Sequence, residues 1–131
     1  MTEYFAGDAG ARADTAGRWV RWDALEPIEM VPGLGFQPVV AGGVMVNFVS
    51  FEPNTAAPVH WHDEEQICVV IDGELEFEVG GETRTMRRGD AVVIPPNTPH
   101  GARTFDDVCL ALDVFHPPRQ GIVEAMPAAE A

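Results

Sequence analysis

Three histidines and one glutamine are the residues best suited to chemistry in this chain of 131 residues. His60 and His62 lie two apart, and residues two apart on a strand project to the same face, so both imidazoles can reach one point. Gln66 has the same parity, and His100 follows a proline-rich turn much later in the chain. Three imidazoles and one amide oxygen make a good site for a divalent transition metal. The spacing therefore predicts one bound metal ion, although it leaves open a solvated His-x-His pair at a strand edge.

Short strands separated by turns must position these four side chains. Runs rich in β-branched and aromatic residues predict strands over 44–51, 66–71, 74–79, 91–105 (one strand ending and another beginning) and 108–115. Asp72-Gly73 is a strong hairpin signal and Gly80-Gly81 marks the next turn. No segment shows a helical period, so we expect an all-β jelly-roll barrel in a single domain.

Composition narrows the partners and the compartment. The net charge is -13, every basic residue is an arginine, and no basic cluster could neutralise a run of phosphates, so nucleic acid is excluded as a partner. No apolar run reaches the length of a membrane span and the N-terminus lacks the pattern of a secretory signal, so we expect a cytoplasmic protein without a membrane partner. Cys68 and Cys109 lie in apolar runs and are predicted to be packed free thiols. We expect a flexible arm over 1–17, the barrel over 18–120 and a loose tail over 121–131.

The order of these residues resembles the two motifs of the cupin superfamily. The first motif corresponds to Asn54, His60, His62, Gln66 and Gly73, and the second to Gly89, Pro95, Asn97, His100 and Thr104. The resemblance covers residues 54–104 and implies the cupin double-stranded β-helix. Asn54 and Asn97 replace glycines, a mild change because Asn tolerates the left-handed conformation. Gln66 replaces the usual glutamate, and a neutral ligand leaves the metal its full charge, which favours an anionic small-molecule substrate.

The run LDVFHPPR over 112–119 is similar to the end of the small single-domain cupins of the pectin-degradation (KdgF-like) group. This resemblance implies conversion of 4,5-unsaturated uronate to 5-keto-4-deoxyuronate, with Asp113 and Arg119 as catalytic residues and Phe115 in the substrate pocket. Asp113 would move a proton, Phe115 would pack on the sugar ring, and Arg119 would clamp the carboxylate. We predict Asn47 and Trp61 as further substrate contacts. Zn, Ni, Mn, Fe, Co and Cu all accept this ligand set, so the metal stays open.

Other functions also stay open. Parity cannot say which face of the last strand is inside, so Asp113 could instead point outward and pair with an arginine. The same metal site would suit a cupin dioxygenase or a polyketide cyclase acting on an aromatic substrate, with a cavity lined by Met45, Val49, Phe51, Trp61 and Val70. A third possibility is a non-catalytic small-molecule-binding cupin. We also expect a homodimer, with the Arg18–Val40 region as its candidate interface.

Overall fold

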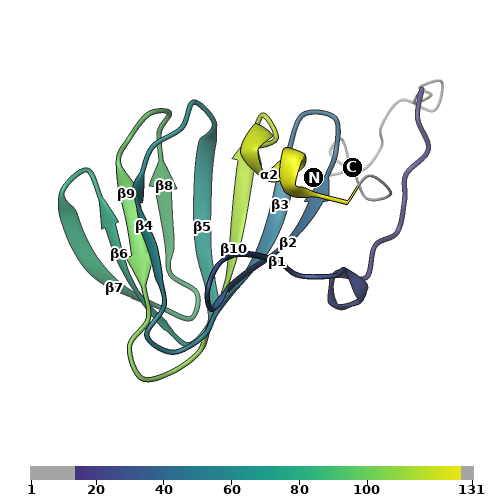
Figure 1. Ribbon diagram of the computed structural model, residues 1–131. Helices are drawn as coiled ribbons and strands as arrows, with labels where there is room; N and C mark the ends of the chain where they lie inside the picture. Colours follow the sequence, from purple (N-terminus) through teal and green to yellow (C-terminus); the bar gives the residue numbers. More distant parts are fainter. Residues whose placement is uncertain (1–13, 128–131) are drawn as a thin grey trace, which may run out of the picture.

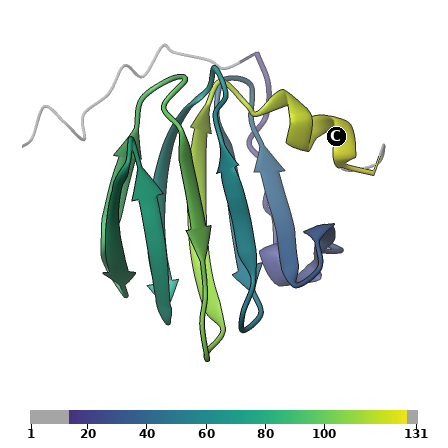
Figure 2. The same ribbon diagram turned by 60° about the vertical axis from the view of Figure 1, so that its left-hand side comes forward.

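The computed structural model describes residues 14–127, and two antiparallel sheets make up most of this part of the chain (Figure 1). The six-stranded sheet has the order β1-β2-β3-β10-β5-β8 and the four-stranded sheet the order β4-β9-β6-β7. The strands are β1 (Ile28–Val31), β2 (Leu34–Val40), β3 (Met45–Phe51), β4 (Ala56–His60), β5 (Glu65–Asp72), β6 (Glu74–Val79), β7 (Glu82–Arg87), β8 (Ala91–Ile94), β9 (His100–Arg103) and β10 (Cys109–His116). Figure 2 shows the strands of both sheets running alongside one another. The expected all-β jelly roll is confirmed.

The core lies between the two sheets because one side of each strand is apolar. On β5, for example, Gln66, Cys68 and Val70 are buried while Glu65 and Ile67 are exposed, which is the period of two that a strand imposes. Both cysteines are free and buried, as predicted. Burial of this apolar surface supplies the main favourable term in folding. The core cluster consists of Leu34, Val49, Phe51, Cys68, Val70, Leu75, Phe77, Met86, Ile94, Cys109 and Ala111.

The two glycine turns that follow β5 and β6 behave differently. Gly80 and Gly81 both have positive φ and close a true hairpin between β6 and β7, as expected. The predicted hairpin at Asp72-Gly73 is wrong, because β5 pairs with β8 and β10 while β6 pairs with β7 and β9. This turn carries the chain from one sheet to the other. Gly73 is required there, since its φ is 86° and a Cβ would lie 2.4 Å from the carbonyl oxygen of Val108.

Two asparagines adopt the left-handed conformation. Asn54 has a φ of 55° and Asn97 a φ of 61°, so the asparagines that replace motif glycines do take up the backbone conformation that favours glycine. The Asn97 N–H donates to the carbonyl oxygen of His62 at 2.8 Å. The turn before His100 is therefore fixed to the turn that carries His62.

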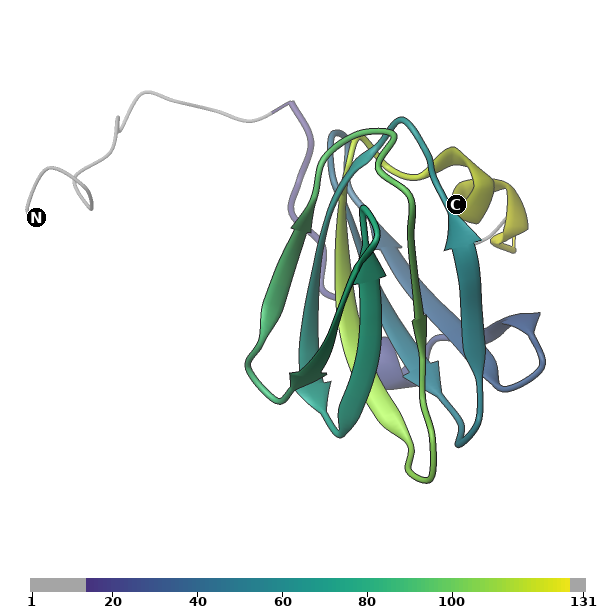
Figure 3. The same ribbon diagram turned by 90° about the vertical axis from the view of Figure 1, so that its left-hand side faces the viewer.

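The described part of the C-terminal tail differs from the loose segment that we expected. Residues 120–125 form helix α2 (Gln120–Ala125), and Ile122 is completely buried against Met45 and Phe115. Figure 3 shows α2 at the upper end of the strands. Six residues are too few to display a helical period in the sequence, which is why the pattern was not visible. The remaining helix is a single 3-10 turn, η1 (Trp22–Ala24). Within residues 14–127 no helix has the length and apolar character needed to cross a membrane.

The N-terminal segment packs on the outside of the six-stranded sheet. The Trp22 ring stacks on Phe48 with centroids 4.7 Å apart. The Gln37 amide donates to the carbonyl oxygens of Trp22 and Leu25. Residues 1–13 of the predicted arm, and 128–131 of the predicted tail, lie outside the described residues.

Candidate metal centre

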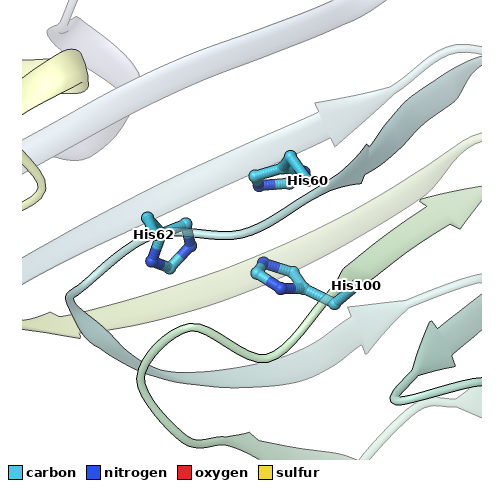
Figure 4. A group of neighbouring side chains, drawn as sticks. All are labelled: His60, His62 and His100. Atoms are coloured by element: carbon cyan, nitrogen blue, oxygen red, sulfur yellow. The ribbon is translucent and has the colours of Figure 1, made fainter.

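Three imidazoles converge between the two sheets. His60 ends β4, His62 lies in the turn that follows, and His100 begins β9. Figure 4 shows the three rings pointing toward one another. One ligand nitrogen from each ring lies within 4.8 Å of the other two. Such a cluster could hold a metal ion.

The close approach of β4 and β9 brings two of these rings together. The register places His60 opposite His100, next to an irregularity in β4. Gly101 follows His100, and a Cβ on Gly101 would lie 3.0 Å from the backbone oxygen of Ala57 and from the backbone nitrogen of Val59. Since these are backbone atoms, they cannot swing aside as a side chain would. The missing side chain at position 101 therefore sets the spacing of the strands at the metal centre.

Hydrogen bonds to the backbone fix the tautomer of each ring. Every Nδ1 contacts a carbonyl oxygen, which can only accept, so Nδ1 carries the proton and Nε2 keeps a lone pair. The partners are Pro58 O for His60 (2.7 Å), Glu64 O for His62 (3.0 Å) and Thr98 O for His100 (2.8 Å). The His100 Nε2 is buried and has no hydrogen-bond partner among the described residues. A buried lone pair without a donor is the state in which a metal ligand is held.

Two of the imidazoles, those of His62 and His100, are also held in their neutral form. Burial, followed by the nearby positive charge of Arg119, lowers the pKa of His62. Burial lowers the pKa of His100 to about 4, and the neighbouring His60, His62 and Arg119 add smaller effects in the same direction. A histidine must be neutral to coordinate a metal. The environment thus suits metal binding at neutral pH.

Gln66 completes the cluster from the opposite sheet. Its amide donates a hydrogen bond to the Asp113 carboxylate, which leaves its Oε1 facing His62 Nε2 at 3.1 Å. Because His62 Nε2 carries a lone pair, two acceptors stand side by side. A cation held by both atoms would satisfy this arrangement. The donor set, three imidazole nitrogens and one amide oxygen, fits a divalent transition metal.

Asp113 points into the barrel from β10. It lies opposite Cys68 on β5 and Asn47 on β3, and Cys109, Ala111 and Phe115 of the same parity are buried. Burial raises the pKa of Asp113 to about 6, although hydrogen bonds from Cys68 and Gln66 and the charge of Arg119 act in the opposite direction. A carboxyl group with a pKa near neutrality can both take up and release a proton.

The other residues predicted to contact substrate divide into two groups. Phe115 is buried with its ring 5.7 Å from that of His62, and Arg119 lines the same cavity with its Nε buried and unpartnered among the described residues. Asn47 is completely buried beside Asp113 and neither atom of its amide has a described partner, but Asn47 is not part of the cavity wall. Trp61 does not belong with them, because it is 66% exposed and absent from the cavity wall. The alternation that turns His60 and His62 inward turns Trp61 outward.

Two residues at the site escaped the sequence analysis as functional groups. Cys68 donates to Asp113 and lines the cavity; its position two residues after Gln66 on the same strand was a usable signal. Glu64 has a largely buried carboxylate whose Oε1 is 3.5 Å from His62 Nδ1 and whose Oε2 accepts from the Gln120 N–H at 3.2 Å. Glu64 reaches the site through its contact with Gln120, which lies after β10, and no sequence pattern predicts where that segment runs.

The cavity beneath these polar groups has mostly apolar walls. The polar groups that reach it are His60, Gln66, His100, Asp113 and Arg119. Apolar side chains make up most of the rest, among them Leu34, Phe36, Val49, Phe51, Leu75, Phe77, Ala111, Phe115 and Ile122. A few convergent polar groups over an apolar interior are typical of small-molecule sites.

Comparisons with known proteins agree with this geometry. The Cupin domain model matches residues 47–115, more than half of the chain. The H2HPP isomerase of Bacillus subtilis is 38% identical over 89 residues, which are 66% of this chain but only 38% of that protein, so the chain spans well under half of it. The pectin degradation protein KdgF of Dickeya dadantii is 31% identical over 77 residues, 58% of this chain and 70% of that protein.

Solved structures show the same relationship. The structure of KdgF from Halomonas sp. aligns with a TM-score of 0.77 and 28% identity, covering 82% of this chain and 99% of that chain. The polyketide cyclase RemF from Streptomyces resistomycificus aligns with a TM-score of 0.69 and 23% identity, covering 79% of this chain and 83% of that one, and shows the fold alone. This chain therefore belongs to the Cupin domain family and is a KdgF-like cupin.

Proposed function

We propose that this chain is a metal-dependent cupin enzyme whose ion is held by His60, His62, Gln66 and His100. Three observations support the proposal: the shared tautomer of the histidines, the unpartnered Nε2 of His100, and the Gln66 Oε1 turned toward the cluster. When bound, the ion would supply Lewis-acid polarisation of a substrate oxygen.

The reaction that we propose is the conversion of 4,5-unsaturated uronate to 5-keto-4-deoxyuronate. The unsaturated sugar is a cyclic enol ether with a hydroxyl group at C1. Opening the ring breaks the bond between C1 and the ring oxygen; the C1 hydroxyl loses a proton and becomes an aldehyde, C4 gains a proton, and C5 becomes a ketone. Atoms balance without any co-reactant, so the protein must only bind the acid and move a proton. The observation that carries the proposal is the group formed by Asp113, Phe115 and Arg119 facing the histidines across the cavity.

Each of these residues has a role suited to its surroundings. Arg119 is the one basic side chain on the cavity wall among the described residues, and its guanidinium would bind the substrate carboxylate with two parallel hydrogen bonds. Asp113, with its raised pKa, would carry the proton between C1 and C4. Phe115 would pack against the sugar ring. Asn47 does not line the cavity, so we assign it no contact with the substrate.

An absorbance assay tests this proposal. Protein loaded with a chosen divalent metal is mixed with unsaturated galacturonate, and the ultraviolet absorbance of the conjugated double bond is followed. We expect the absorbance to fall faster than in buffer with the same metal. Decay equal to the buffer control with every metal tried would contradict the proposed substrate.

The apolar cavity walls favour a second candidate, an aromatic substrate handled by a cupin dioxygenase or polyketide cyclase. Val49 and Phe51 line the cavity as that hypothesis expects, whereas Met45, Trp61 and Val70 do not. Oxygen consumption that requires added Fe(II) and an aromatic acid would support the dioxygenase. Absence of oxygen uptake with every metal would exclude it.

We further propose a homodimer formed through the outer face of the six-stranded sheet. Two cross-strand rows on this face contain no charged residue: Val93, Ile67, Val114 and Val46 in one, and Ala91, Val69 and Leu112 in the other, which ends at Phe48 under the Trp22 ring. Val93 is 61% exposed and Ile67 39%, and a contiguous apolar patch of this kind marks an interaction surface. The fitting partner is a second copy, because this uncharged face lets two chains of net charge -13 meet without burying like charges. Trp19, in the Arg18–Val40 region that we predicted as the interface, is fully exposed as well.

Light scattering after size exclusion tests the dimer. We expect a dimeric wild type and a monomeric Ile67→Glu, Val93→Glu double variant. A Glu78→Gln variant on the other sheet controls for a general change of surface charge and should stay dimeric. A monomeric wild type would contradict the proposal.

A further inference from the structure

The Glu64 carboxylate has no role in the proposed reaction, yet it contacts both the metal-ligand candidate His62 and the backbone of Gln120. The Glu64 side chain is 14% exposed and that of His62 is 8% exposed. Glu64 Oε1 lies 3.5 Å from His62 Nδ1, while Oε2 accepts a hydrogen bond from the Gln120 N–H at 3.2 Å. Gln120 directly follows Arg119 and begins α2.

We infer that Glu64 is a positioning residue that links the metal ligand His62 to the backbone carrying Arg119, so that metal binding and the placement of Arg119 are coupled. The inference rests on the proposed metal centre. It goes beyond that proposal by connecting the metal ligands, which hold the ion, with the separate segment that would hold the substrate carboxylate.

Electrostatics gives the first half of the link. An imidazole that coordinates a cation through Nε2 becomes more positive and its Nδ1–H becomes a stronger donor. A carboxylate oxygen 3.5 Å away favours that charged state. Arg119 has the opposite effect on the ring, since its positive charge disfavours a charged His62. Glu64 thus offsets the repulsion between Arg119 and a bound cation.

Hydrogen bonding gives the second half. The Gln120 N–H donates to Glu64 Oε2, whereas the His62 Nδ1–H donates to the backbone oxygen of Glu64 and has Oε1 of the same residue 3.5 Å away, so both ends of the side chain face an N–H group. Only a carboxylate offers an acceptor at both ends. A glutamine of the same shape would present an NH₂ group to one of the two donors, so it would break one contact while preserving the packing. Glu65, the first residue of β5, is exposed and provides a matched control.

The first experiment measures zinc affinity by competition with a chromophoric chelator, using the full chain. We expect Glu64→Gln to bind Zn²⁺ roughly 10- to 100-fold more weakly than wild type, the usual loss when a partner of a ligating histidine is removed. Glu65→Gln removes the same charge from the neighbouring residue and should bind like wild type. A Glu64→Gln protein with wild-type affinity would overturn the electrostatic half of the link.

The second experiment tests the connection to Arg119 by hydrogen exchange of the segment 117–126, with and without Zn²⁺. Gln120 is the first helical residue, a position where proline is tolerated. Gln120→Pro therefore deletes the N–H that Glu64 accepts and leaves the carboxylate intact, while Gln120→Ala keeps the N–H. We expect zinc to slow exchange in this segment in wild type and Gln120→Ala, but not in Gln120→Pro or Glu64→Gln.

The outcomes separate the two proposals. Zinc binding by wild type without any change in exchange of 117–126, or the same change in all variants, would overturn the link and leave the metal centre standing. A wild type that binds no zinc, nickel or manganese would overturn the metal centre and the link together. If Glu64→Gln fails to fold, the pair Gln120→Pro and Gln120→Ala still decides the question, because neither changes a residue of the metal cluster.

Discussion

The two sheets of this barrel carry different chemistry on both of their sides. Facing inward, the four-stranded sheet and its adjoining turn present three imidazoles, whereas the six-stranded sheet presents Gln66, Asp113 and Phe115. Facing outward, the four-stranded sheet carries ion pairs such as Arg103 with Glu76, whereas the six-stranded sheet carries rows of aliphatic side chains.

This difference indicates that, in the proposed reaction, holding the metal and moving the proton would be separable tasks. Side chains from different sheets approach one another only across the cavity, so a change in one sheet can remove one task and spare the other. Gln66 is the exception, since it lies on the six-stranded sheet and faces the histidines. Substitutions in each sheet should therefore give distinct defects.

The largest effect is expected from the four-stranded sheet. His100→Ala removes one imidazole and should weaken Zn²⁺ binding by at least about 100-fold, because even the outer partners of a ligand are worth 10- to 100-fold. Activity should be lost with the metal. Isothermal titration and metal analysis of the purified protein check this. His116→Ala, in the one histidine outside the cluster, should bind metal normally.

The matching change in the six-stranded sheet is Asp113→Asn. We expect turnover of unsaturated uronate to fall by roughly 10²- to 10⁴-fold, since a positioned acid or base contributes that much. Zinc affinity should be retained, because the asparagine oxygen can still accept from Gln66. Turnover and zinc affinity that fall in parallel would show that the two tasks are not separable.

In the metal-free protein, one titrating group in each sheet should make the free energy of unfolding depend on pH, and the two dependences should have opposite signs. The pKa of Asp113 is raised from 3.8 to about 6 in the folded state. The stability that this group contributes to the folded state is therefore present below pH 4 and is lost as pH rises to 6. The pKa of His100 is lowered from 6.5 to about 4, so its contribution is present above pH 6.5 and is lost as pH falls to 4. Each is worth about 3 kcal/mol, and the two oppose each other in this interval.

Asp113→Asn makes this opposition visible. The variant keeps only the histidine contribution, so its free energy of unfolding should rise by about 3 kcal/mol between pH 4 and pH 6.5 relative to the wild-type trend. Urea denaturation with a chelator present, at several pH values, provides the measurement. A variant whose pH trend parallels wild type would refute the assigned sign.

The smallest effect is expected on the outer face of the four-stranded sheet. Glu76 pairs with Arg103 at 2.8 Å, but the arginine side chain is 57% exposed. Glu76→Gln should therefore cost less than about 1 kcal/mol of unfolding free energy, and less still in high salt. A loss above 2 kcal/mol in urea denaturation would mean that these ion pairs stabilise the sheet more than exposed pairs do elsewhere.

Strand alternation made much of the site predictable from sequence. The two-residue spacing of His60 and His62 predicted that their imidazoles converge, although His62 lies in the turn after β4 and Gln66 reaches the cluster from the other sheet. Asn54 and Asn97 were recognised as residues that accept a left-handed backbone, and both adopt it. These features depend only on neighbours in the chain.

Features that depend on distant segments could not be predicted in the same way. Asp72-Gly73 signalled a tight turn correctly, but a turn does not encode which sheet the next strand joins. The α2 helix exists because Ile122 finds Met45 and Phe115 beneath it. Trp61 is a different case, since alternation already argued that it points away from its two histidine neighbours.

The absent side chain at Gly101 limits how this protein can be altered. A methyl group there would press on the backbone of β4 at Ala57 and Val59, and relief would come only from widening the gap between the strands that carry His60 and His100. Mutagenesis aimed at new substrates can vary the cavity wall broadly, yet we expect a mutation at this small residue to disturb the coordination geometry without touching a single ligand.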